Sequence, residues 1–173
     1  YALSTGPGIS GVAVIRVSGK ETASVIKKLT GKNLPTPRIA TLRKINNINT
    51  SEMIDEGIIL WFPGPDSYTG EDMAEFHVHG SRAIVSALHS SINGIKNCRL
   101  AEPGEFTKLA FQNEKINLLK AESIADLVSA ETELQRKQAY SHISGGFSLI
   151  TKKIYNDLKK HYLWWAGGFF DTL

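Results

Sequence analysis

The chain has one cysteine, Cys98, among its 173 residues, and it has neither a long apolar run nor a dense block of one charge. A single thiol closes no internal disulfide and supplies no cysteine-pair zinc site, which excludes a disulfide-framed secreted fold. No stretch approaches the roughly 18–20 apolar residues of a membrane span. The composition therefore predicts a globular protein of a reducing compartment, with no membrane span.

The residues that are present are sufficient for a folded core. Hydrophobic residues make up 42% of the chain and charged residues 21%, which excludes intrinsic disorder as the general state. Lysine and arginine number 20 against 17 acidic residues, a formal net charge of +3. So small an excess permits contact with nucleic acid but does not argue for it.

The order of apolar patterns favours an α+β fold. Strands are expected at residues 12–17, 41–45, 57–62 and 72–79, where β-branched or alternating residues are bounded by glycine and proline. Helices are expected over 21–31, over 81–94 and in a short stretch ending at 111. Strands alternating with helices favour a mixed β-sheet with packed helices over residues 1–115. The proline-free stretch beyond predicts the start of an all-α domain over 116–173.

Two glycine patterns resemble nucleotide-binding loops only superficially. Gly6, Gly8 and Gly11 match G-x-G-x-x-G, but a strand follows them where that fingerprint requires a helix. Gly19 and Lys20 lack the leading glycine of a P-loop and precede a glutamate. We therefore predict a turn at the first pattern and no GTP binding by this chain alone.

Charged and imidazole side chains alternate along the strand expected at 72–79. Glu75, His77 and His79 would share one face, which leaves open a metal site, a ligand site or a half-buried face whose polar groups bond one another. Arg16 interrupts an apolar strand, so it needs an anionic or carbonyl partner if buried and none at an exposed strand end. Spacing alone does not predict that these side chains converge.

The last residues are unusually aromatic. Trp164, Trp165, Phe169 and Phe170 lie close together near the end of the chain. A helix end packed against another segment is one interpretation, and a platform on which nucleobases stack is the alternative.

Five motifs in order resemble those of the MnmE/TrmE family of tRNA modification GTPases. They are GVAVIRVSG at 11–19, YTGED at 68–72, HG at 79–80, PGEFT at 103–107 and AESIADL at 121–127. The resemblance extends from about residue 1 to about residue 158. It departs from the family where members often have Asn-Gly-Lys, because this chain has Glu114 between Asn113 and Lys115.

The resemblance implies a fold, a cofactor and a site. Family members have an N-terminal domain similar to the folate-binding domain of aminomethyltransferases, which dimerises and binds 5-formyl-tetrahydrofolate or a related tetrahydrofolate. A helical domain follows, with an inserted GTPase domain that uses GTP, Mg²⁺ and K⁺. The family's folate contacts correspond here to Arg16, Glu75 and Lys115. This chain corresponds to the first part only, so no catalytic or metal-binding residue is assigned to it and no GTP hydrolysis is expected from it alone.

The resemblance also implies partners and a compartment. Members act as homodimers with a flavin-dependent MnmG/GidA-type partner to modify carbon 5 of the wobble uridine of tRNA. Details at residues 60–65, 76–80 and 130–133 look most like mitochondrial members, so a mitochondrial location is expected, with the bacterial cytoplasm as the alternative. Two other functions stay open: a structural dimerisation module that does not bind folate, and a freestanding one-carbon transferase.

Overall fold

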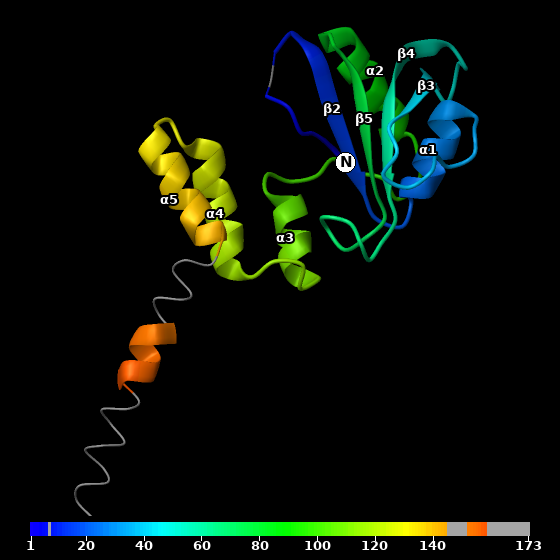
Figure 1. Cartoon of the computed structure of the whole chain (residues 1–173). Helices are drawn as coiled ribbons and strands as arrows, with labels where there is room; N and C mark the ends of the chain where they lie inside the picture. Colours follow the sequence, from blue (N-terminus) through cyan, green and yellow to red (C-terminus); the bar gives the residue numbers. More distant parts are fainter. Residues whose placement is uncertain (7, 145–151, 159–173) are drawn as a thin grey trace, which may run out of the picture. The chain divides into compact units, whose positions relative to one another are not determined.

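The computed structural model describes residues 1–6, 8–144 and 152–158 (Figure 1). The chain divides into two compact units, Tyr1–Lys115 and Ile116–Leu173. A β-sheet and three helices make up the first unit, and helices alone are found in the described part of the second. The α+β class is therefore confirmed. The aromatic residues from Trp164 to Phe170 lie outside the described residues.

The sheet has five strands in the order β1-β2-β5-β4-β3. Their bounds are β1 Ala2–Leu3, β2 Ser10–Ser18, β3 Thr41–Asn46, β4 Met53–Phe62 and β5 Met73–Gly80. Every paired neighbour in the described residues is antiparallel, so the expectation of a mixed sheet was wrong in this respect. Short loops return the chain from β3 to β4 and from β4 to β5, which leaves no room for a crossover helix.

Helices α1 (Thr22–Thr30) and α2 (Arg82–Asn93) pack on one face of the sheet. The helix ends agree with the sequence: Gly31 adopts the left-handed conformation after α1, and the Ser81 hydroxyl accepts a hydrogen bond from the Ile84 amide. Apolar side chains of both helices and the sheet form one buried cluster, which includes Ile15, Val25, Ile26, Leu29, Ile59, Phe76, Leu88 and Ile92. This cluster is the core of the first unit.

Strand alternation separates this core from a second, polar face. Ile15 and Phe76 are fully buried, while their neighbours Arg16, Glu75 and His77 project from the opposite face and are partly exposed. The expected alternation of β5 is confirmed, because Ala74, Phe76 and Val78 are all buried. The charged residues singled out on β2 and β5 therefore share a face.

The second unit contains a pair of capped helices. Helices α4 (Leu118–Ser129) and α5 (Glu133–Ile143) contact each other. Asn117 caps α4, and Thr132 with Gln135 forms a capping box at α5. No helix in the described part of the chain is long and apolar enough to cross a membrane.

Helix α3 (Glu105–Gln112) begins at an ion-paired carboxylate. The Glu105 carboxylate binds the Arg99 guanidinium and accepts a 2.7 Å hydrogen bond from the Glu102 amide. These contacts lower the pKa of Glu105 to about 2.

We therefore expect Glu105 to stabilise the first unit above its ordinary pKa of 4.5, and to lose that contribution as pH falls toward about 2. Urea midpoints measured between pH 6 and pH 3 should fall more steeply for the wild type than for Glu105→Gln. Arg99 is largely exposed, so high salt should reduce this difference. If the urea midpoints of the wild type and Glu105→Gln fall equally with pH at low salt, the prediction is contradicted.

Candidate functional site

Arg16 and Glu75 are bound to each other on the polar face of the sheet, opposite the face covered by α1 and α2; we call it the open face. They are opposite residues in the register of β2 and β5. Nε and one terminal nitrogen of Arg16 donate to Oε1 of Glu75 at 3.0 and 2.7 Å. The side chains are 27% and 15% exposed, so the pair is reachable from solvent yet partly desolvated. The anionic partner that Arg16 requires is therefore Glu75, the second residue that the family resemblance assigns to the folate.

Two aromatic rings flank the Arg16 guanidinium. Its central carbon lies 5.7 Å from the ring centroid of Tyr68 and 5.5 Å from that of Phe106. The Tyr68 hydroxyl hydrogen-bonds to the Thr107 hydroxyl at 3.0 Å, which ties the loop before β5 to α3. Cation–π contacts and the bond to Glu75 hold the guanidinium in one place.

Both histidines of β5 bond to carboxylates. Nε2 of His77 lies 3.3 Å from Oε2 of Glu75, and Nδ1 of His79 lies 2.9 Å from Asp55. Burial raises the pKa of Asp55, but hydrogen bonds from the His79 backbone and ring and from the Glu56 amide hold it below its ordinary value. The described residues contain no cluster of three or more His, Cys, Asp or Glu that could hold a metal. The reading in which polar groups bond one another is therefore supported.

Lys115 lies in the turn that follows α3. Its amide donates to the Ala110 carbonyl at 2.8 Å, and its side chain is exposed. A Cβ added to Gly70 would lie 3.3 Å from Cγ of Lys115, so the loop before β5 passes directly beside this lysine. That loop also contains Tyr68, which contacts Arg16. One short loop thus contacts both Lys115 and the ion pair.

Glu114 adopts the left-handed conformation, with a φ of 57°. The family pattern often has a glycine at this position, and glycine adopts positive φ without strain. A glutamate side chain disfavours that backbone conformation. We expect Glu114→Gly to raise the free energy of unfolding by about 0.5–1 kcal/mol, measured as a higher urea midpoint.

Glu131 provides the matched control for that substitution. It is also an exposed loop glutamate, but it is not among the residues with positive φ, so Glu131→Gly should lower the midpoint. Equal shifts in the two variants would mean that the backbone conformation of Glu114 is not the cause.

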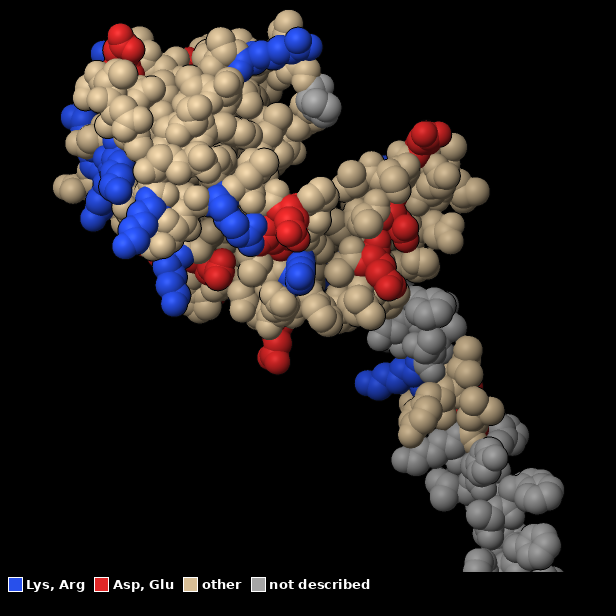
Figure 2. All heavy atoms as spheres, turned by 180° about the vertical axis from the view of Figure 1, so that it is seen from behind, with Lys and Arg blue, Asp and Glu red and all other residues tan. Residues whose placement is uncertain are grey.

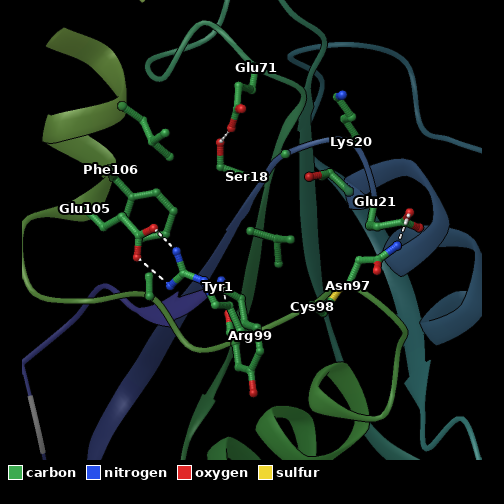
Figure 3. Close-up of a pocket in the computed structure, with 15 residues that line it drawn as sticks. Tyr1, Ser18, Lys20, Glu21, Glu71, Asn97, Cys98, Arg99, Glu105 and Phe106 are labelled. Atoms are coloured by element: carbon green, nitrogen blue, oxygen red, sulfur yellow. Dashed lines mark hydrogen bonds and ion pairs between the residues drawn. The ribbon is translucent and has the colours of Figure 1, made fainter. Parts of the chain in front are cut away.

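A hollow of about 470 Å³ lies next to the Arg16–Glu75 pair, at one end of the sheet (Figure 3). Its lining includes Ser18, Glu71, Arg99, Glu105 and Phe106. Figure 3 shows Ser18 and Glu71 joined by a hydrogen bond, and the Glu105–Arg99 pair near the Phe106 ring. None of the three predicted site residues lines the hollow, and Phe106 is the lining residue that contacts Arg16. The hollow is thus adjacent to the candidate site rather than identical with it.

Several residues around the site were not identified from the sequence. In the sequence, Tyr68, Thr69 and Phe106 are recognisable only as members of motifs, and no pattern assigns a role to the Asn113 amide. Tyr68 and Thr69 lie just before Gly70, and Phe106 lies two residues after Gly104; both glycines adopt positive φ, which marks their loops in the sequence. Asn113 has a different signal, because it directly follows α3 as its C-terminal cap. Which side chains such loops bring together depends on the packing of distant segments.

Comparisons with known proteins agree with this architecture. The model of the family "GTP-binding protein TrmE N-terminus" matches residues 1–115. The chain is 77% identical over 145 residues to "tRNA modification GTPase MnmE" of Pelagibacter ubique (strain HTCC1062), covering 84% of this chain and 33% of that protein. It is 53% identical over 145 residues to the protein of the same name from Maricaulis maris (strain MCS10), with coverage of 84% and 33%.

A mitochondrial protein also matches. The chain is 45% identical over 160 residues to "5-taurinomethyluridine-[tRNA] synthase subunit GTPB3, mitochondrial" of Danio rerio, covering 92% of this chain and 32% of that protein. The chain spans about a third of the length of these relatives. Since the family model covers the whole of the first unit, the chain belongs to the TrmE family and contains its N-terminal domain.

Proposed function

We propose that this chain is the folate-binding and dimerising part of a tRNA modification GTPase, with 5-formyl-tetrahydrofolate or a related tetrahydrofolate bound at Arg16, Glu75 and Lys115. The observation that carries the proposal is the partly exposed Arg16–Glu75 pair, with Lys115 on the far side of the same loop. The residues are those that the family resemblance assigns to the folate.

The chemistry of the pair suits a pterin ring. Both bonds from Arg16 reach Oε1 of Glu75, and Oε2 has one long contact with His77. A carboxylate has about four acceptor positions, so Oε2 is available to the amide and amino N–H groups of a pterin edge. Lys115 is exposed and cationic, so it can meet a carbonyl or a glutamate carboxylate of the ligand.

Calorimetric titration of the purified chain with 5-formyl-tetrahydrofolate tests this function, with the mass in solution measured on the same sample. Heat of binding together with a dimer mass would support both parts of the proposal. A folded monomer that gives no heat would overturn both.

A structural dimerisation module is the second candidate, and one observation favours it. Leu42 and Ile58 are opposite each other on β3 and β4, on the open face, and remain 65% and 41% exposed. Apolar side chains paired across an uncovered sheet face are typical of an interface. A dimer that gives no heat with the folate would favour this candidate over the first.

In the proposed full-length protein, GTP with Mg²⁺ and K⁺ belongs to the GTPase domain, and tRNA is modified together with a flavin-dependent MnmG/GidA-type partner. Cationic side chains on the face shown in Figure 2 are separated by uncharged surface instead of forming one block. Such spacing predicts little counterion release, so we assign no independent tRNA affinity to this chain. A strongly salt-dependent gel shift with tRNA would contradict that assignment.

The two proposed compartments follow from the two kinds of relative. The matching proteins include mitochondrial ones and bacterial ones. The identity of 77% to the Pelagibacter protein, against 45% to the Danio protein, favours the bacterial cytoplasm over the mitochondrion expected from sequence details.

A further inference from the structure

Asn113 anchors the turn that contains Lys115 to the loop before β5. Its side-chain Nδ2 donates a 2.7 Å hydrogen bond to the carbonyl oxygen of Thr69. Cβ of Asn113 and Cγ of Lys115 both lie so near Gly70 that an added methyl group would come within 2.9 and 3.3 Å of them. The turn therefore rests on the loop at two consecutive residues, Thr69 and Gly70.

Thr69 connects this contact to the strand of Arg16. Its side chain is fully buried, and its hydroxyl lies 2.7 Å from the hydroxyl of Ser18, two residues beyond Arg16 on the same face of β2. The Thr69 hydroxyl also accepts from the Glu71 amide at 3.4 Å. The carbonyl and hydroxyl of one buried residue thus join the Lys115 turn to β2.

The backbone hydrogen bonds of the turn go to α3: the amides of Asn113 and Glu114 donate to carbonyl oxygens of that helix at 2.9 and 3.1 Å. Lys115 is exposed, and its amide bond to Ala110 belongs to the end of α3, so it does not fix the turn against the sheet. Glu114 has a positive φ, which its side chain disfavours. We therefore expect the turn to change its backbone conformation once the Asn113–Thr69 hydrogen bond is removed. The hydrogen bond from Asn113 to Thr69 therefore ties the turn to the loop before β5, which the backbone bonds to α3 do not do.

We infer that Asn113 is a positioning residue that sets the Lys115 ammonium relative to the Arg16–Glu75 pair. The inference rests on the proposed folate site and adds to it a residue that need not touch the ligand. Asn113 then acts on affinity only through Lys115, and this separates positioning from a general loss of stability.

A double-mutant cycle with calorimetry tests this role. We expect Asn113→Ala to weaken binding of 5-formyl-tetrahydrofolate about five- to tenfold, and to change it less than about twofold when Lys115→Met is already present. Asn47→Ala is the matched control, since Asn47 also bonds to backbone in the same unit, accepting from the amides of Asn49 and Thr50. Asn47→Ala should lower the melting temperature and leave the affinity unchanged.

Trypsin cleavage after Lys115 tests the anchor without any ligand. We expect this cleavage, followed by mass spectrometry, to be about three times faster or more in Asn113→Ala than in the wild type or Asn47→Ala. If the wild type binds the folate and Asn113→Ala binds it with the same affinity, the inference is overturned and the folate site is retained. Absence of binding by the wild type, with faster cleavage in Asn113→Ala, would reject the folate site while retaining the anchor.

Discussion

Glu75→Ala is expected to weaken binding of 5-formyl-tetrahydrofolate about 100-fold or more, the largest effect on affinity that we predict for a single side chain. Removing the carboxylate deletes the proposed acceptor for the pterin edge and leaves Arg16 without its partner. Hydrogen bonds to charged groups contribute about 1.5–3 kcal/mol each, so losing two of them gives an effect of this size. Calorimetry on the folded variant measures it.

Two further variants make that result interpretable. Glu133→Ala removes a second, more exposed Arg–Glu pair, since Glu133 binds Nε and a terminal nitrogen of Arg136 at 2.8 Å in the second unit. It should leave the folate affinity unchanged. Glu75→Gln keeps the shape and one acceptor oxygen, so its loss of affinity should lie between those of the wild type and Glu75→Ala. An affinity unchanged in Glu75→Ala would remove this residue from the site.

Gly57→Ala is expected to destabilise the first unit by about 2–4 kcal/mol, the largest effect on stability that we predict. An added Cβ would overlap the backbone carbonyl oxygen of His77 and lie 3.2 Å from its carbonyl carbon. The obstacle is backbone in the neighbouring strand β5, which cannot move aside as a side chain can. The melting temperature should fall by about 10 °C or more.

Gly11→Ala is the matched control for this substitution. Gly11 is also a strand glycine, but nothing lies within 4 Å of its added Cβ and its φ is not positive. Its melting temperature should stay within a few degrees of the wild type. Because β5 carries Glu75 and His77, Gly57→Ala should also weaken the folate site; a stable variant with normal affinity would contradict the strand packing described above.

Local features of the chain were predictable in some detail. The β-branched run of β2, the alternation of β5, the left-handed Gly31 and the Ser81 cap depend on residues close together in sequence, so each could be recognised from its own pattern. The antiparallel arrangement was not predicted. Alternation of strands and helices does not reveal that α1 leads from β2 to the far edge of the sheet, at β3.

The sequence by itself determined the class of fold, the segments that form its elements and, through five ordered motifs, the family. Only the tertiary structure decided that Arg16 and Glu75 pair, that Tyr68 and Phe106 flank them, and that Asn113 holds the Lys115 turn on Thr69. Partners separated by 44 residues or more meet through strand register and loop packing. These arise when the core closes, so no short-range pattern specifies them.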